Sequence, residues 1–338
     1  MRILCMNWFA DDPAEIERKR CHDVTFDIWR GRPNQDPIPP EEICRDAAAI
    51  INYSGVELLG REPAAFERCQ IVVRSSTGYD NIDLAGWSAR GVPVCNVPDY
   101  GVSEVADHAI ALMLSLTRGT VAYHDALLRQ GAPGWRLDVA PLVRRLRGGV
   151  FGVVGLGRIG LAAANRAAGF GMEIVFYDPY VATGFELAVG FRRVNRLSEL
   201  LAISDVVSLH TPLTHETERM IDAAALAAAK PGLVLVNTAR GRVVDLDALY
   251  AAIKRGQVGG AALDVLPQEP FDQTHPLIAA WLAQEPWIKG RLSLTPHAAF
   301  YSAASMLDMR LKALEVLLTY LREGRLMNCV NLNQLSRA

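Results

Sequence analysis

The stretch Val-Phe-Gly-Val-Val-Gly-Leu-Gly-Arg-Ile-Gly, residues 150–160, decides the fold of this chain. Its apolar first half predicts a buried strand, and its second half has the pattern Gly-x-Gly-x-x-Gly at the start of a helix. Gly155 permits the tight turn, Gly157 lets a pyrophosphate approach the backbone, and Gly160 allows the helix to pack closely on the strand. The free N–H groups of the helix N-terminus attract phosphates, so the stretch predicts a dinucleotide-binding site.

A second predicted strand, Glu173–Tyr177, supports this interpretation because it ends at an acid. Asp178 lies eighteen residues after Gly160 (178 − 160). A carboxylate at this place accepts hydrogen bonds from the adenosine ribose hydroxyls and repels a 2′-phosphate. No arginine directly follows Asp178. These features predict NAD (NADH) as the cofactor and disfavour NADP.

The rest of the chain alternates short β-branched segments with helical patterns, which predicts an α/β protein with parallel sheets. The N-terminal part forms a small domain, with strands predicted around Ile3 and over Val24–Ile28, Ile50–Asn52, Ile71–Arg74 and Val92–Asn96, and helices over Glu41–Ala49 and Leu84–Arg90. A second domain has the strand spacing of a doubly wound sheet. Its strands are predicted over Val150–Val154, Glu173–Tyr177, Val206–Leu209, Leu233–Asn237, Gly260–Asp264 and Leu292–Thr295.

Three further helices are predicted. A long apolar helix covers Ser103–Arg118, and a helix over Leu246–Arg255 is capped by Asp245 and stopped by Gly256. The last helix runs from Ser302 to Glu323 and is expected to dock one leucine stripe on an apolar surface. The stripe consists of Leu307, Leu311, Leu314, Leu318 and Leu321.

Composition excludes several classes of function. The 338 residues include 35 basic and 37 acidic ones, so the net charge of −2 gives no basic surplus for nucleic acid or anionic lipid. No apolar run reaches the roughly 20 residues of a membrane span, and the N-terminus lacks a basic leader, which predicts a cytosolic (cytoplasmic) protein. The six cysteines are scattered without metal-ligand spacing and are expected to be buried thiols.

Polar residues follow three neighbouring strands of the second domain. The stretches are Asn237–Gly241, Asp264–Pro270 and Thr295–Ala299. Because ligands of open α/β sheets collect at the carboxyl ends of the strands, these stretches are expected to converge on one crevice.

These residues resemble those of the D-isomer-specific 2-hydroxyacid dehydrogenases, a family related to phosphoglycerate dehydrogenase, glyoxylate/hydroxypyruvate reductase and the C-terminal-binding-protein corepressors. The resemblance covers nearly the whole chain after about Ile71. Its motifs are Thr77–Asp83, Val94–Pro98, Gly155–Gly160, Tyr177–Tyr180, Asn237–Gly241, Gly260–Asp264 and Thr295–Ala299. Cys95–Pro98, Phe176–Tyr180 and Asn328–Asn331 look closest to the corepressor branch.

The resemblance implies a Rossmann-type NAD-binding domain, residues 102–298, inserted into a smaller flavodoxin-like substrate domain, residues 1–101 plus 299–338. It also implies a cleft that closes on substrate and a homodimer joined through the cofactor domain. The apolar helix over residues 103–116 is a plausible interface.

Reducing a 2-keto acid requires a cation for the carboxylate, a proton donor at the carbonyl oxygen and a nicotinamide held over the carbonyl carbon. Arg240 offers a planar, permanently charged fork suited to a carboxylate. His297 is interpreted as the acid/base, and Glu269 as the carboxylate that orients and stabilises its imidazole. The resemblance implies the same catalytic trio.

Further contacts are predicted from the matching motifs. Cofactor contacts are Thr77, Gly155, Gly157, Arg158, Ile159, Gly160, Asp178, His210, Thr211, Pro212, Thr217, Thr238, Ala239, Arg240, Asp264, His297 and Ala299. Substrate contacts are Ser75, Ser76, Thr77, Gly78, Arg240, His297 and Phe300. Relatives commonly have glycine where Ser76 stands, so a side chain there narrows the pocket or adds a hydrogen bond. Phe300 is interpreted as a pocket wall or as core packing.

The sequence leaves rival functions open. A corepressor-like scaffold that senses NAD(H) with little turnover has the same trio, and a phosphite-type dehydrogenase is a third candidate. The natural keto acid is not determined, because one pocket methylene changes preference by only about 1–3 kcal/mol. The remaining histidines, interpreted as exposed or structural, are His22, His108, His124, His215 and His275.

Overall fold

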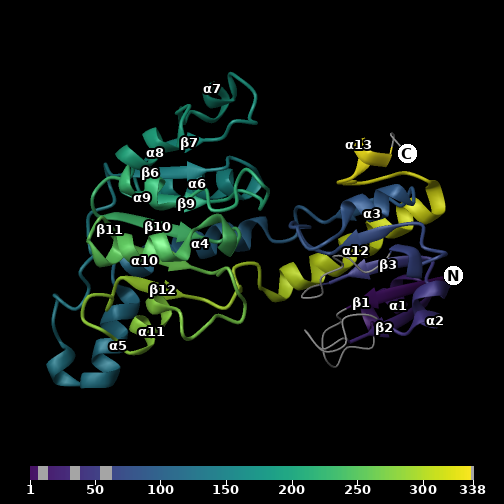
Figure 1. Ribbon diagram of the computed structural model, residues 1–338, viewed down its shortest axis with the longest axis horizontal. Helices are drawn as coiled ribbons and strands as arrows, with labels where there is room; N and C mark the ends of the chain where they lie inside the picture. Colours follow the sequence, from purple (N-terminus) through teal and green to yellow (C-terminus); the bar gives the residue numbers. More distant parts are fainter. Residues whose placement is uncertain (7–13, 31–38, 54–62, 336–338) are drawn as a thin grey trace. The chain divides into compact units, whose positions relative to one another are not determined.

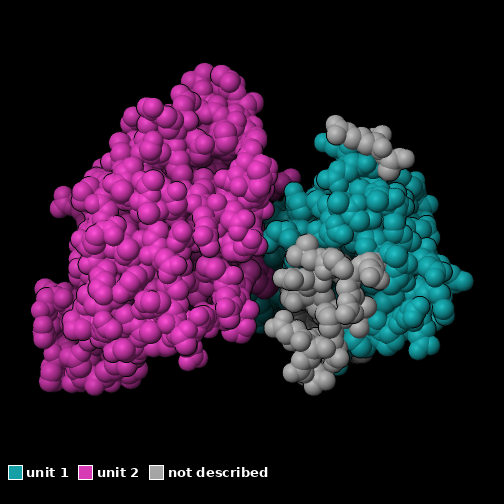
Figure 2. Space-filling model, in the orientation of Figure 1, with its two compact units in different colours: residues 1–101, 301–338 teal, residues 102–300 magenta. Residues whose placement is uncertain are grey.

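The computed structural model describes residues 1–6, 14–30, 39–53 and 63–335. The chain divides into two compact units (Figure 2). Unit 1 consists of residues 1–101 and 301–338, and unit 2 consists of residues 102–300. Both units are α/β, with sheets in which every strand pair is parallel. The predicted fold class is therefore confirmed.

The described residues of unit 1 form a five-stranded sheet in the order β2-β1-β3-β4-β5. Its strands β2, β1 and β3 lie side by side in Figure 1. Its strands are β1 (Arg2–Met6), β2 (Thr25–Trp29), β3 (Ala49–Asn52), β4 (Val72–Arg74) and β5 (Val94–Asn96). Its helices are α1 (Glu15–Arg20), α2 (Glu41–Asp46), α3 (Leu84–Ala89), α12 (Ala303–Glu323) and α13 (Leu332–Leu335). Successive strand residues face opposite layers: Cys5 and Val73 pack with α12, whereas Leu4 and Val72 pack with Trp87 of α3.

In unit 1, one local prediction was wrong and one helix was missed. The helix expected to reach Ala49 ends at Asp46, because Ala47 is already extended and Ala49 pairs with β1 as the start of β3. Alanine favours helices, but strand pairing overrides that weak preference here. Helix α1 was not predicted.

The described residues of unit 2 form a seven-stranded sheet in the order β12-β11-β10-β9-β6-β7-β8. Its strands are β6 (Val150–Val154), β7 (Glu173–Tyr177), β8 (Arg192–Arg193), β9 (Val206–Leu209), β10 (Leu233–Asn237), β11 (Val258–Leu263) and β12 (Leu292–Leu294). Its helices are α4 (Val102–Thr117), α5 (Thr120–Gln130), α6 (Arg158–Gly169), α7 (Phe185–Val189), α8 (Leu197–Ile203), α9 (Ala223–Ala227), α10 (Leu246–Lys254) and α11 (Pro276–Leu282). This is the predicted doubly wound sheet, whose strand order reverses between β6 and β9.

Helices cover both faces of the unit 2 sheet. Phe151 and Val153 of β6 pack with α4 and α6, whereas Val154 packs in the cluster that includes Leu200 of α8 and Leu249 of α10. The predicted cap of α10 is confirmed, because the Asp245 carboxylate accepts a hydrogen bond from the N–H of Ala248. The apolar face of α4, the helix predicted as a plausible dimer interface, packs against α6 and the sheet within unit 2.

Helix α12 docks on unit 1 as predicted, and part of the predicted stripe lies on the docking face: Leu314 is buried, and Leu318 and Leu321 pack against the same cluster. Its buried apolar residues are Met309, Ala313, Leu314, Val316 and Leu317, whereas Leu307 is 42% exposed. Arg310 lies in the middle of this buried face, paired with the fully buried Glu17 of α1. The leucine spacing therefore predicted part of the docking face but did not reveal the buried Arg310 on it.

Cysteine burial agrees with the prediction. All six cysteines lie in the described ranges as free thiols; five are buried and Cys329 is partly buried. Among the described helices, none combines the length and the apolar character that crossing a membrane would require.

We predict that Arg310→Met destabilises the protein by about 3–5 kcal/mol, because it leaves the Glu17 carboxylate charged and unpaired in the core. The two guanidinium nitrogens now donate to Glu17 at 2.8 and 2.6 Å. Lys312→Met is the control on the same helix, since Lys312 pairs with the exposed Asp99 at 3.0 Å and should lose about 1 kcal/mol or less. Urea unfolding measures both, and equal losses would contradict the prediction.

Candidate active site

The candidate site lies at the carboxyl edge of the unit 2 sheet. Because all seven strands are parallel, the segments that follow them leave the sheet at the same edge. The predicted residues of unit 2 follow β6, β7, β9, β10, β11 and β12. The neighbouring strands β10, β11 and β12 carry Arg240, Glu269 and His297 in the segments after their ends.

The glycine turn after β6 fits a dinucleotide. Gly155 has a φ of +88°, and a Cβ added to Gly160 would lie 2.1 Å from the carbonyl oxygen of Gly155. The strand-to-helix turn therefore requires glycine at both places. A Cβ on Gly157 would meet no described atom within 4 Å, so the N-terminus of α6 opens onto free space. That opening is where the backbone N–H groups can receive a pyrophosphate.

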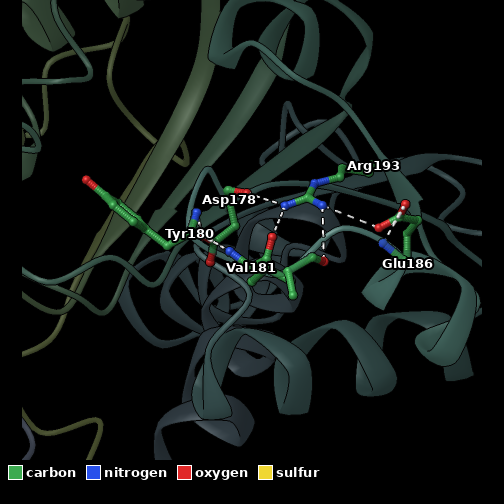
Figure 3. A network of polar contacts seen from close by, with 7 residues as sticks. Asp178, Tyr180, Val181, Glu186 and Arg193 are labelled. Carbon is green, nitrogen blue, oxygen red and sulfur yellow. Dashed lines mark hydrogen bonds and ion pairs between the residues drawn. The ribbon is translucent and has the colours of Figure 1, made fainter.

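Asp178 is held firmly at the end of β7 (Figure 3). Its Oδ2 accepts from the N–H of Leu156 at 2.8 Å, and its Oδ1 accepts from the N–H groups of Tyr180 at 2.8 Å and Val181 at 3.2 Å. A carboxylate has about four acceptor positions, so some capacity remains for ribose hydroxyls. The glycine turn and the acidic strand end thus form one connected structure.

The segment after β9 contributes a neutral histidine. The Nε2 of His210 bonds the Ser208 hydroxyl at 2.9 Å, and its buried Nδ1 has no hydrogen-bond partner among the described residues. Burial lowers the pKa of His210 to about 4, so the ring is uncharged at neutral pH. The buried Thr238 hydroxyl after β10 is likewise unpartnered in the described ranges. Buried polar atoms are normally paired, so these two fit a site that a polar ligand completes.

The other predicted residues of this segment stabilise its turn. The Thr217 hydroxyl donates to the carbonyl of Pro212 at 2.6 Å and accepts from the N–H of Thr214 at 2.8 Å. The residue before Thr217, Glu216, accepts a hydrogen bond from the Tyr180 hydroxyl. This contact joins the segment after β9 to the segment that carries Asp178.

His297 is held in an uncommon backbone conformation. Its φ is +51°, in the left-handed region, and its N–H donates to the carbonyl oxygen of Asp264 at 2.8 Å. Histidine enters this region more readily than most residues, but the conformation still needs support. The support comes from the Asp264 side chain, which is 2% exposed as a residue and lies just after β11.

The Asp264 carboxylate bonds the whole turn around His297. Oδ1 accepts from the Thr295 hydroxyl at 2.6 Å and from the N–H of Ala298 at 2.9 Å, and Oδ2 accepts from the N–H of Ala299 at 3.0 Å. Asp264 was predicted as a cofactor contact. Its observed bonds make it the anchor of the His297 turn, with acceptor capacity left on Oδ2.

His297 and Glu269 form a dyad. The Nδ1 of His297 lies 2.7 Å from Oε2 of Glu269, and their side chains are 42% and 40% exposed. The other Glu269 oxygen accepts from the N–H of Leu266 at 3.0 Å, which orients the carboxylate. The Nε2 of His297 has no protein partner in the part of the chain that the structure describes, so it can exchange a proton with a ligand.

Arg240 is presented by a rigid turn after β10. The Asn237 side chain accepts from the N–H of Ala239 and donates to the carbonyl of Arg240, both at 2.9 Å. The half-buried Arg240 guanidinium donates to the Ala239 carbonyl at 2.8 Å. Next to the dyad, the Phe300 ring meets the His297 ring edge-on, with centroids 6.2 Å apart.

The remaining predicted substrate contacts lie in unit 1, after β4. The Ser75 hydroxyl donates to the carbonyl of Asn52 at 3.0 Å, and the Ser76 hydroxyl donates to the carbonyl of Gly78 at 2.9 Å. The Asn96 amide donates to the carbonyl of Thr77 at 2.8 Å. The Ser76 side chain therefore closes its own loop, which accounts for a side chain in place of glycine.

Sequence reasoning missed the role of His108. This residue of α4 has its Nε2 3.0 Å from the Thr295 hydroxyl and 3.5 Å from the Asp264 carboxylate, so it supports the His297 turn. No local signal could reveal this, because the contact joins residues 187 positions apart.

Comparison with known proteins finds relatives in one family. The sequence profile of the D-isomer specific 2-hydroxyacid dehydrogenase, NAD binding domain, matches residues 110–299. Glyoxylate reductase from Korarchaeum cryptofilum is 36% identical over 314 residues, which is 90% of this chain and 89% of that protein. C-terminal-binding protein 1 from Caenorhabditis elegans is 35% identical over 279 residues, which is 81% of this chain. That match spans 37% of the length of C-terminal-binding protein 1.

A similar solved structure is the NADPH-dependent glyoxylate/hydroxypyruvate reductase from Sinorhizobium meliloti, in complex with NADP and malonate. The two folds superpose with a TM-score of 0.80 at 30% identity, over 99% of this chain and 97% of that chain. The matching profile describes an NAD-binding domain, whereas this neighbour holds NADP. The comparisons therefore support a dinucleotide-binding domain, and both NAD and NADP occur among the similar proteins.

We predict that Gly157→Ala weakens NADH binding about tenfold without destabilising the protein, because the methyl group occupies the open space at the N-terminus of α6. Gly169→Ala is the matched control, since a Cβ on this last residue of the same helix also meets no described atom within 4 Å. Fluorescence titration with NADH and thermal unfolding measure the two effects. Unchanged NADH affinity in Gly157→Ala would contradict the assignment of the turn.

Proposed function

The chain belongs to the D-isomer-specific 2-hydroxyacid dehydrogenase family, and from this premise we propose that it is an NAD-dependent reductase of small 2-keto acids. The observation that carries the proposal is the His297–Glu269 dyad, in which Nδ1 of His297 lies 2.7 Å from Oε2 of Glu269. Structural histidines are normally satisfied at both nitrogens, whereas the Nε2 of His297 has no described protein partner. A positioned imidazole of this kind acts as an acid/base at a carbonyl.

We propose that each member of the trio has a separate task. His297 gives the proton from Nε2 to the oxygen of the keto acid during reduction, and takes it back in the reverse direction. Glu269 holds the imidazole through Nδ1 and stabilises its charged form, because an adjacent carboxylate favours a cation. Arg240 binds the substrate carboxylate with its planar fork of N–H donors.

The hydride for carbon 2 of the keto acid would come from NADH when it is bound. The residues that would hold it are the glycine turn at the N-terminus of α6, Asp178, His210 and Thr238. The two unpartnered polar atoms of His210 and Thr238 support such a ligand. The Asp178 carboxylate supports a preference for NADH over NADPH, because it repels a 2′-phosphate.

We propose unit 2 as the cofactor domain and unit 1 as the substrate domain. The loop Ser75–Gly78 binds substrate in this proposal, with its shape set by the Ser76 and Asn96 side chains. Phe300, whose ring contacts that of His297, forms an apolar wall of the substrate pocket.

The binding-scaffold alternative is not favoured. The glyoxylate reductase matches over 89% of its length, whereas the corepressor matches over 37% of its length.

NADH oxidation with glyoxylate, hydroxypyruvate, pyruvate and phenylpyruvate, each repeated with NADPH, tests the proposed reaction. Turnover with NADH on any of these acids is the expected result, with NADPH slower. Tight NADH binding with no turnover on every acid would favour the scaffold instead.

His297→Asn is expected to lower kcat by about 10²–10⁴-fold, the usual contribution of acid/base catalysis, while NADH affinity changes less than about twofold. Asparagine is chosen because it tolerates the positive φ of this position. Glu269→Gln keeps a hydrogen-bonding group but removes the charge, and should reduce kcat by about tenfold to 100-fold. His215→Asn, at a side chain 91% exposed, is the control. A His297→Asn enzyme with full kcat would exclude the proposed acid/base.

We further propose a homodimer formed through α5 and the segment after it. This region exposes Leu128, Trp135 and Leu137 at 76%, 83% and 87%, and clustered exposed apolar side chains mark association surfaces. Leu137→Glu is expected to give a monomer by light scattering, whereas Leu187→Glu, at an equally exposed leucine of α7, keeps the wild-type mass. A wild-type protein with the mass of one chain would refute the dimer.

A further inference from the structure

The segment that follows β7 carries the Asp178 carboxylate but has little regular structure of its own. Between the end of β7 at Tyr177 and the start of α7 at Phe185, the described chain forms turns and bends. The carboxylate of Asp178 bonds N–H groups of this segment and of the glycine turn. The direction of the Asp178 carboxylate therefore depends on the contacts that hold the backbone carbonyl groups of the same segment.

Arg193 bonds these carbonyl groups (Figure 3). Its guanidinium donates to the carbonyl of Asp178 at 2.9 Å, to the carbonyl of Val181, and to the carbonyl of Ala182 at 3.3 Å. The three acceptors come from one short segment and converge on one side chain. Arg193 itself is fixed in β8, where it pairs with Phe176 of β7.

The chemistry of arginine suits this task. Its planar fork presents five N–H donors in fixed directions, whereas an ammonium group is a compact point charge on a flexible stem. The guanidinium also lies over the Phe176 ring, with its central carbon 5.7 Å from the ring centroid. With only 17% of its side chain exposed, Arg193 has the burial of a structural group.

The positive charge of Arg193 is matched within the same network. Glu186 of α7 lies 3.4 Å from the guanidinium and also accepts from the N–H of Gly184 at 3.2 Å. The guanidinium is therefore engaged by three carbonyls and a carboxylate. This engagement distinguishes Arg193 from an arginine that receives a 2′-phosphate.

We infer that Arg193 is a positioning residue of the dinucleotide site, which aims the Asp178 carboxylate through the backbone carbonyls and thereby sets the preference for NADH over NADPH. The inference rests on the proposed NADH-dependent function. A correctly aimed carboxylate favours the ribose hydroxyls of NADH and opposes the 2′-phosphate of NADPH. If the segment is loosened, the carboxylate loses both its attraction for the ribose hydroxyls and its repulsion of the 2′-phosphate.

Arg193→Met tests the inference, because methionine keeps apolar packing on Phe176 but removes every donor. The dissociation constants of NADH and NADPH are measured by fluorescence titration of the full chain, independently of turnover. We expect NADH to bind about tenfold more weakly, as for the loss of a hydrogen bond to a charged group, while NADPH affinity changes less than about threefold. At saturating NADH, kcat should stay within about twofold of wild type.

Two further variants sharpen the test. Arg193→Lys, which can reach fewer carbonyls, should bind NADH with an affinity between those of wild type and Arg193→Met. Arg192→Met is the matched control, since Arg192 precedes Arg193 in β8 but is exposed and lies 3.8 Å from Glu173. It should leave both dissociation constants unchanged.

The outcomes separate the inference from the proposed function. Equal weakening of NADH and NADPH by Arg193→Met, or no weakening of either, overturns the positioning role. The same effect from Arg192→Met also overturns it. If wild type binds neither dinucleotide, the proposed function fails, irrespective of Arg193.

Discussion

The site depends on the bonding of one buried carboxylate. Asp264 lies just after β11 and is almost inaccessible to solvent, so its charge is costly unless donors surround it. The donors come from the Thr295 hydroxyl and the N–H groups of Ala298 and Ala299. Satisfying this one group folds the segment after β12 into a tight turn. The left-handed backbone and the orientation of His297 follow from that turn.

Parallel strands extend this constraint to the rest of the site. Because their carboxyl ends share one edge, groups far apart in the chain are brought to the same side of unit 2. Arg240 and Glu269 then need only local bonds, from Asn237 and from the N–H of Leu266, to be oriented. The sheet places these residues at one edge, and local hydrogen bonds orient their side chains.

The sequence by itself determined the features that have a local physical cause. The turn after β6 requires glycine at Gly155 and Gly160 because a side chain would collide with the backbone. The cap at Asp245 and the strand periods follow from hydrogen bonding and burial along short segments. The resemblance of the motifs then identified the family and predicted a catalytic trio. The local sequence patterns did not predict the hydrogen bonds that hold His297 and Glu269 together.

Only the tertiary structure decided the features that depend on long-range partners. Arg310 is buried on α12 because Glu17 meets it there, and His108 supports the His297 turn because α4 packs beside the sheet. Likewise, Arg193 acts on Asp178 because β8 pairs with β7. Charged residues are expected at the surface until a partner is known, and no local pattern reveals a partner that distant segments supply. The physical reason is that the free energy of burying a charge depends on the groups around it in space, not on its neighbours in the chain.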